Sequence, residues 1–209
     1  MNGRVPYPHN RAAIAELVGA DQAELWPDAG GLLAARTRPE ELGTVYPHRW
    51  DVPREAWVRL FGSAEREIAI LAYSALFLAE DAGILGILAN KGSSGVTVRI
   101  ALGDPDGPNV AERGEEEGIG DAMAAKIRNA LTLYRPLRTV ENIQVRLHRT
   151  VLYNSIYRAD ERLLINQHTY GIPAAQAPVF CLSSTSDGEM AALYLESFER
   201  VWAEAVALA

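Results

Sequence analysis

The chain has 209 residues, of which 48% are hydrophobic and 22% are charged, and its formal net charge is −7. This length predicts one main domain with room for a small appendage, and the apolar fraction excludes general disorder. A single cysteine, Cys181, excludes an intramolecular disulfide and a cysteine-based zinc site. The acidic balance argues against a broad nucleic-acid-binding surface but leaves room for a local basic pocket.

Membrane and secretion signals are absent from the sequence. No apolar run reaches the ~18 residues that a transmembrane helix needs. The first ten residues also lack the apolar stretch of a signal peptide. We therefore expect a cytoplasmic protein with no membrane partner, and nothing in the sequence calls for a cofactor.

The chain divides into three predicted parts. Residues 1–27 carry two short helical patterns, which are too small to enclose a core of their own. Residues 28–52 are rich in Pro, Gly and Arg, which predicts a linker that packs on the main domain through Tyr46 and Trp50. Residues 53–209 form the predicted main domain.

Helical and strand patterns alternate through the main domain. This order predicts an α/β sandwich with a mixed, partly parallel sheet, preceded by the short helical segment. A turn over Ala159, Asp160 and Glu161 separates two adjacent strands. The predicted helices cover 53–64, 79–95, 109–134 and a long segment from about 187, and the predicted strands cover 68–73, 96–102, 143–148, 150–160, 161–168 and 177–184.

Three loops follow the predicted parallel strands, where such sheets bind ligands. They span 73–77, 103–108 and 148–150. The middle loop lacks the glycine spacing and the lysine of a phosphate-binding P-loop. It predicts a tight turn with Asp104 pointing into the site, whereas Asp104 and Asp106 are too weak a pattern for a metal, and no metal site is predicted.

The third loop carries the most informative histidine. Strand alternation puts Arg146, His148 and Thr150 on one face, where an arginine beside a histidine suits an anion. His148 is either a nucleophile or acid–base group for phosphoryl chemistry, or a hydrogen-bonded histidine with a structural role. Both interpretations remain open at this point.

Polar residues interrupt the apolar strand that follows. Asn154 and Ser155 are expected to be hydrogen-bonded inside a site or a network. His168 is either a second site histidine or a loop residue. The acidic run 112–121 is either a solvated face or a loop over a pocket with Arg113 directed inward. The predicted ligand-binding residues are Tyr73, Asp104, Arg146, His148, Thr150, Asn154, Ser155 and His168.

From about residue 45 to its end, the chain resembles the C-terminal domain of actinobacterial XRE-type helix-turn-helix regulators, a domain of unknown function. The segment 5–27 resembles the last part of an XRE-type DNA-binding domain running into its linker. This implies that 1–27 is a remnant, without the DNA-reading helix, and that DNA contact needs a helix-turn-helix domain mostly absent here. The segments that carry the first resemblance are 45–53, 70–81, 98–122, 124–131, 147–171 and 194–205.

The pattern around His148 also resembles one half of a phospholipase-D-like fold. That superfamily uses His-x-Lys, an Asp five residues after the Lys, and a downstream Gly-Ser-x-Asn. Here Thr150 occupies the Lys position, Ser155 the Asp position, and 166–169 lacks Gly and Ser. Since threonine cannot supply the lysine's charge, the resemblance implies a retained pocket with lost or altered catalysis. It also implies a homodimer with His148 of each copy near the axis.

Three functions follow from these observations. The first is a regulatory ligand-sensing and dimerisation domain with a pocket for a small anionic, phosphate-containing ligand. The second is a phosphodiesterase or transferase that acts through a covalent phospho-His148 intermediate. The third is a dimerisation module that binds no ligand.

Overall fold

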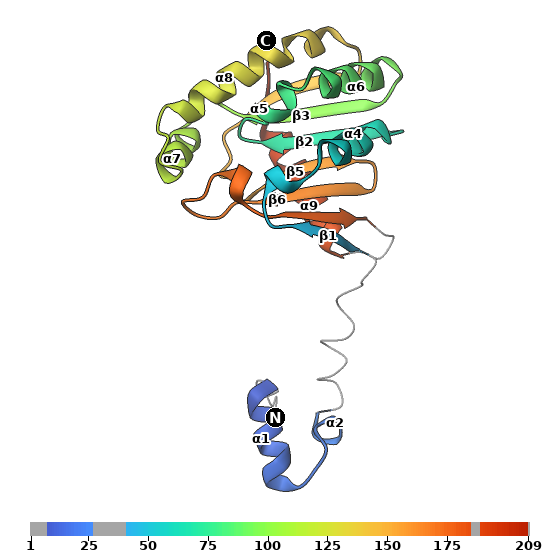
Figure 1. Ribbon diagram of the computed structural model, residues 1–209, viewed down its shortest axis with the longest axis vertical. Coiled ribbons are helices and arrows are strands. Elements are labelled where there is room, and N and C mark those ends of the chain that lie inside the picture. Colours follow the sequence, from blue (N-terminus) through green and yellow to red (C-terminus); the bar gives the residue numbers. More distant parts are fainter. Residues whose placement is uncertain (1–7, 27–40, 185–188, 209) are drawn as a thin grey trace. The chain divides into compact units, whose positions relative to one another are not determined.

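The computed structural model describes residues 8–26, 41–184 and 189–208. The chain separates into two compact units, 1–39 and 40–209. In the first unit, α1 (Pro8–Val18) and α2 (Gln22–Leu25) confirm the two predicted helical segments (Figure 1). Gly19 follows α1 with a φ of 63°, a conformation that suits the end of a helix. No helix in the described ranges is long and apolar enough to cross a membrane.

The described part of the second unit forms an eight-stranded mixed sheet in the order β1-β7-β6-β5-β2-β3-β4-β8 (Figure 1). β2, β3 and β4 are parallel, and the other pairings are antiparallel. The predicted mixed, partly parallel sheet is therefore confirmed. The strands are β1 (Leu42–Tyr46), β2 (Glu67–Ala72), β3 (Thr97–Gly103), β4 (Ile143–His148), β5 (Asn154–Ala159), β6 (Arg162–Gln167), β7 (Val179–Ser183) and β8 (Val206–Ala207).

Helices cover both faces of this sheet, which confirms the predicted α/β sandwich (Figure 1). Ile68 and Ile70 of β2 point to one core, which contains α4, α5, α6 and part of α8. Ala69 and Leu71 point to a second core, which contains α9 and parts of α7 and α8. The helices are α4 (Arg54–Gly62), α5 (Leu76–Ala79), α6 (Ala82–Ser93), α7 (Pro108–Glu116), α8 (Ala122–Tyr134) and α9 (Glu189–Glu204), with short 3-10 turns η1 (Arg49–Asp51), η2 (Arg135–Thr139) and η3 (Ala174–Gln176).

The single helix predicted over 109–134 is wrong, because the chain breaks it into α7 and α8. Gly118 and Gly120 take φ values of 68° and 48° between the two helices, a region that glycine adopts without strain. The break lets Gly114 of α7 approach the backbone of Gly120 closely. The hairpin predicted around Asp160 is confirmed, since β5 and β6 pair antiparallel on either side of it.

Part of the linker predicted over 28–52 is a strand of the sheet. β1 pairs antiparallel with β7, so these residues belong with the second unit. Tyr46 packs against the first core as expected, whereas Trp50 is 60% exposed and the expectation for it is wrong. The Glu41 carboxylate accepts a hydrogen bond of 2.6 Å from the Ala191 amide of α9, near its N-terminus. Residues 28–40 of the predicted linker lie outside the described residues.

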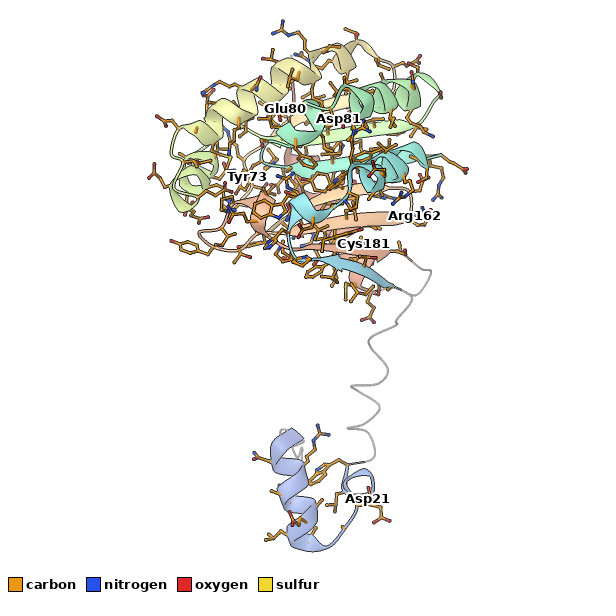
Figure 2. The ribbon with its side chains drawn as sticks, viewed as in Figure 1. Asp21, Tyr73, Glu80, Asp81, Arg162 and Cys181 are labelled. Carbon is orange, nitrogen blue, oxygen red and sulfur yellow. The ribbon has the colours of Figure 1, made fainter. Side chains whose placement is uncertain are left out.

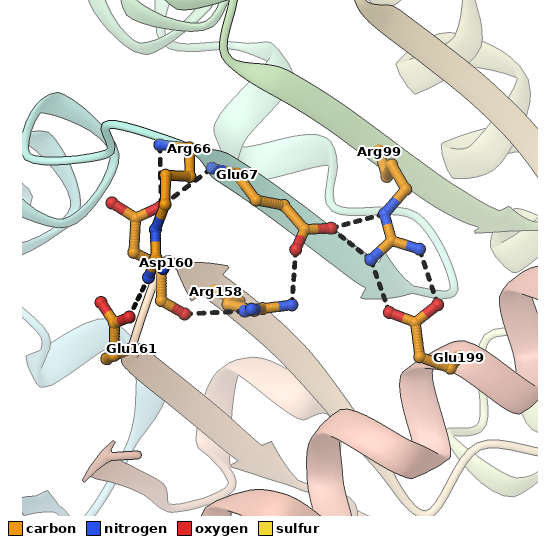
Figure 3. A network of polar contacts seen from close by, with 7 residues as sticks. All are labelled: Arg66, Glu67, Arg99, Arg158, Asp160, Glu161 and Glu199. Atoms are coloured by element: carbon orange, nitrogen blue, oxygen red, sulfur yellow. Dashed lines mark hydrogen bonds and ion pairs between the residues drawn. The ribbon is translucent and has the colours of Figure 1, made fainter. Parts of the chain in front are cut away.

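A network of ion pairs ties the amino ends of β2 and β3 and the carboxyl end of β5 to α9 (Figure 3). The Glu67 carboxylate of β2 pairs with Arg99 of β3 and Arg158 of β5. Arg99 also donates two hydrogen bonds, of 2.7 and 2.5 Å, to Glu199 of α9. This network lies at the end of β2 opposite to the loop 73–77.

Candidate functional site

A cavity of about 240 Å³ lies where β2 ends, inside the second unit. The loop 73–77 forms part of it, as predicted for a loop at the carboxyl end of a parallel strand. The loops 103–108 and 148–150 do not line it. Tyr73 and Glu80, both labelled in Figure 2, line the cavity. The complete lining is Arg49, 72–77, Glu80, Glu117, Met123, Lys126, Ser155, Tyr157, His168 and 173–175.

Two predicted residues meet in this cavity, Ser155 from β5 and His168 from just after β6. The Ser155 Oγ lies 3.0 Å from His168 Nε2, and His168 Nδ1 lies 3.1 Å from the carbonyl oxygen of Leu152. Because a carbonyl oxygen only accepts, Nδ1 carries the proton and Nε2 accepts from the Ser155 hydroxyl. The expected hydrogen bond of the buried Ser155 is therefore present.

Burial keeps the His168 imidazole neutral. It lowers the pKa of His168 to about 4, and the positive charges of Arg113 and Arg49 act in the same direction. At neutral pH the Nε2 lone pair is therefore available to the Ser155 hydroxyl. Such a neutral histidine is a hydrogen-bonding group and a proton acceptor, not a fixed positive charge.

The ring of Tyr73 lies near both predicted histidines, His148 and His168. Its ring stacks on His168 with a centroid separation of 5.9 Å and an interplanar angle of 23°, and it is 6.1 Å from the ring of His148. The Tyr73 hydroxyl accepts a 3.1 Å hydrogen bond from the Leu152 amide. Leu152 thus contacts Tyr73 through its N–H and His168 through its carbonyl, which fixes the two rings relative to each other.

His148 does not line the cavity, and both of its ring nitrogens are occupied. Its side chain is 2% exposed, Nε2 lies 3.3 Å from the Ala72 carbonyl oxygen, and Nδ1 accepts from the Thr150 amide at 3.3 Å. Burial lowers its pKa, so the ring is neutral. A nucleophile needs a free lone pair directed at its substrate. The structural interpretation of His148 fits these contacts, and the nucleophilic one does not.

The two faces of the sheet divide the predicted cluster. Ser155 lies on the face of the first core, whereas Asn154, Arg146 and His148 lie on the α9 face, because side chains alternate along strands. Arg146 Cζ sits 4.3 Å from the centroid of a Trp202 ring, and its Nη1 donates to the Trp202 carbonyl. Arg146 therefore packs on α9 and does not line the cavity, contrary to its expected place beside an anion.

Asp104 and Thr150 contribute to the turn structure next to His148. The Asp104 carboxylate accepts hydrogen bonds of 2.8 Å from Arg149 Nε and 3.0 Å from the Asp106 amide, so the predicted tight turn is present. The Asp104 carboxylate does not line the cavity. The Thr150 carbonyl accepts from the Asn109 side chain at 3.0 Å. Through that contact and its amide, Thr150 ties the end of β4 to α7 and His148.

Several cavity residues were not predicted. Arg49 Cζ lies 3.9 Å from the centroid of the Phe77 ring, and Tyr157 lies two residues beyond Ser155 on the same face of β5. Only the strand period could have indicated Tyr157. Arg49 comes from the segment predicted as linker, which carries no periodic signal.

The acidic run 112–121 is not merely a solvated face. Arg113 is 5% exposed and pairs with Glu117 at 2.7 Å, and it also donates to the Ile172 carbonyl. Glu117 lines the cavity, so the alternative interpretation, in which the run lies beside a pocket and Arg113 is directed inward, is the better description.

The cavity combines aromatic rings with cations. Over residues 41–184 and 189–208, neither Arg49 nor Lys126 lies within 4.0 Å of a carboxylate, whereas Glu117 is paired with Arg113. The Glu80 carboxylate also lines the cavity and has no ion-pair partner in the described residues, so the two cations outnumber the unpaired carboxylate by one. This excess of positive charge suits an anionic group, and the neutral Ser155–His168 pair supplies directional hydrogen bonds beside it. In the same described ranges, no group of three His, Cys, Asp or Glu side chains is placed to hold a metal ion.

No family model and no curated protein matches the chain. Among solved structures, TrmBL2, an archaeal chromatin protein described with a novel mode of DNA binding, has a TM-score of 0.48 and 16% identity; the match covers 100% of this chain and 76% of that one. Nuc from Salmonella typhimurium, a phospholipase D family member, has a TM-score of 0.43 and 18% identity, over 74% of this chain and 90% of that one. Similarity at this level transfers no chemistry.

Proposed function

We propose that residues 40–209 form a regulatory domain that binds a small ligand with an anionic, phosphate-like group in the cavity at the end of β2. The observation that carries this proposal is the pair of cavity cations, Arg49 and Lys126, neither of which has a carboxylate partner in the described parts of the chain. Guanidinium and ammonium groups bind phosphate oxygens through charge-assisted hydrogen bonds.

The rest of the lining supports a small organic ligand rather than a bare ion. Phe77, Tyr73 and Tyr157 supply aromatic surface, and Ser155 with His168 supplies a donor–acceptor pair. A cavity of about 240 Å³ is small for a ligand pocket, which limits the ligand to a few carbon atoms beyond its anionic group.

The ligand test is a thermal-shift screen of nucleoside monophosphates and phosphorylated sugars, followed by calorimetry with inorganic phosphate. We expect a binder to raise the melting temperature, because it binds only the folded state. Arg49→Gln and Lys126→Gln should each weaken binding at least about tenfold, which corresponds to ~1.4 kcal/mol. The matched control is Arg162→Gln, an exposed cation outside the cavity, which should leave affinity unchanged.

Two results would overturn the ligand proposal. One is a screen in which no anionic compound changes the melting temperature. The other is a bound anion whose affinity is the same in the wild type, Arg49→Gln and Lys126→Gln. Both variants remove an exposed or half-buried charge, so the fold should persist and the comparison stays interpretable.

We further propose that this domain works in a homodimeric XRE-type transcriptional regulator. The resemblance over 45–205 supports this role, and residues 1–27, with α1 and α2, are proposed as the last part of a helix-turn-helix domain that would contact DNA. Ligand binding would then bias DNA binding through the geometry of the dimer.

Exposed apolar side chains support a second copy as partner. Tyr153 is 78% exposed, Tyr170 is 83% exposed and Val151 is 51% exposed, on neighbouring loops joined by the His168 N–H to Tyr153 carbonyl hydrogen bond. Light scattering should give the mass of a dimer for the wild type and of a monomer for Tyr153→Ser with Tyr170→Ser. A monomeric wild type would contradict this part of the proposal.

A further inference from the structure

We propose that Ser155 is a nucleophile with His168 as its general base, and that the cavity hydrolyses small carboxylic esters that carry an anionic group. This inference rests on the proposed ligand site, because the same cavity binds the substrate. It adds a covalent reaction at Ser155, which neither a sensor nor a phospho-histidine mechanism requires.

The direction of two hydrogen bonds carries the argument. The Leu152 carbonyl holds the proton of His168 on Nδ1 at 3.1 Å, so Nε2 is left as the acceptor for the Ser155 hydroxyl at 3.0 Å. A hydroxyl, an imidazole base and a group that orients the imidazole form the arrangement that activates serine nucleophiles. Here the backbone carbonyl of Leu152 is the group that orients the imidazole.

Rigid elements hold the pair in position. Ser155 lies within β5 opposite Asn166 of β6, and His168 follows the end of β6 directly. The stacked Tyr73 ring restrains His168 from the other side. Ser155 and His168 both line the cavity, so a bound ester has access to the hydroxyl without a movement of the sheet.

The reaction needs only ester and water. The Ser155 Oγ attacks the acyl carbon while its proton passes to His168 Nε2, and the proton then leaves with the alcohol as the carbon–oxygen bond breaks. A water molecule attacks the acyl-serine, gives a proton to Nε2, and Ser155 recovers that proton as the acid departs. Arg49 and Lys126 supply positive charge in the same cavity for the anionic group and the developing oxyanion.

The buried imidazole predicts a characteristic rate profile. Because burial lowers the pKa of His168 to about 4, its base form is fully populated over pH 6 to 8. The acylation rate constant should therefore be flat in that range. The same burial disfavours the imidazolium intermediate, so acylation should be easier to detect than rapid turnover.

The test is treatment of the full chain with 4-nitrophenyl acetate, followed by intact and peptide mass spectrometry. We expect one acetyl group, located on Ser155 in the wild type and absent in Ser155→Ala. His168→Gln should slow acylation at least about tenfold. Ser197→Ala, an exposed serine of α9 outside the cavity, should match the wild type in extent and rate.

Three outcomes would overturn the inference: no acetyl group on Ser155 of the wild type, equal acylation in His168→Gln, or a rate constant that falls steeply from pH 8 to pH 6. The wild-type peptide map locates the adduct even if Ser155→Ala does not fold. Calorimetry with inorganic phosphate on the same samples separates the two proposals. Phosphate binding without acylation refutes only the nucleophile. Acylation without phosphate binding keeps the nucleophile but refutes the anion site and, with it, the anionic class of substrate.

Discussion

The ring of Tyr73 stacks on the ring of His168, with centroids 5.9 Å apart and planes 23° from parallel. The same tyrosine accepts the Leu152 N–H through its hydroxyl, and the Leu152 carbonyl accepts from His168. The backbone of Leu152 therefore links Tyr73, whose ring restrains His168, to the hydrogen bond that keeps the His168 proton on Nδ1. Removal of the Tyr73 hydroxyl therefore tests whether this arrangement stabilises the site.

Tyr73→Phe should lower the free energy of unfolding by about 1–3 kcal/mol, because the buried Leu152 N–H loses its acceptor. Urea denaturation measures the change. The matched control is Tyr46→Phe, whose hydroxyl makes no hydrogen bond with the described residues. Equal free energies for the Tyr73→Phe variant and the wild type would mean that the Leu152 amide does not depend on this hydroxyl.

Acidification should destabilise the protein through its buried histidines. Burial lowers the pKa of His168 to about 4, against 6.5 in an unfolded chain, and lowers the pKa of His148 as well. Between those two values the unfolded state binds more protons, so stability is complete above pH 6.5 and falls as the pH drops toward 4. The His168 contribution has a slope of up to about 1.4 kcal/mol per pH unit.

His168→Gln removes this contribution without removing the carboxylates that titrate at lower pH. Chemical denaturation at pH 7, 6 and 5 should therefore give a shallower loss of stability for the variant than for the wild type. Identical slopes for the two proteins would show that His168 titrates normally in the folded state.

Alanine should have opposite effects on stability at two helical glycines, one in close contact with the loop before α8 and one beside open space. A Cβ on Gly114 would overlap the carbonyl oxygen of Gly120, so Gly114→Ala should lower stability by about 1–3 kcal/mol. A Cβ on Gly86 of α6 has no atom within 4 Å, so Gly86→Ala should raise stability by about 0.5–1 kcal/mol. Thermal melts of both variants check the signs, and a neutral Gly114→Ala would argue against the close approach.

Removal of the Glu67 carboxylate should lower stability more than removal of the Glu196 carboxylate, because only Glu67 pairs with largely buried arginines. Glu67→Gln leaves Arg99 and Arg158, which are 15% and 19% exposed, without their shared carboxylate (Figure 3). We expect a loss of about 1–3 kcal/mol in the free energy of unfolding. Glu196→Gln breaks an exposed pair with Arg200 and should change stability by less than about 0.5 kcal/mol. Urea titrations of both variants test the difference, which should vanish if the Glu67 pairs are weak.

Much of the fold follows from local patterns. Short apolar runs between helical segments predicted β2, β3 and β4, and the Asp160 turn predicted the hairpin of β5 and β6. The break between α7 and α8 was missed, because the apolar stripe that indicated a helix, Met123, Ile127, Ala130 and Leu131, lies entirely within α8 and carries no information about the residues before it. β1 was missed because its pairing with β7 joins residues far apart in the chain.

Within the site, the sequence by itself determined that Ser155 would need a hydrogen-bond partner, since polar groups in apolar strands must be hydrogen-bonded, and it left His168 open as a site residue or a loop residue. It also determined which side chains of one strand share a face. Only the tertiary structure decided which strands lie side by side. β5 pairs with β2, which brings Ser155 next to the loop 73–77, whereas β3 separates β2 from β4, the strand of Arg146 and His148. Strand order depends on the packing of both cores, and periodicity along a single strand carries no information about it.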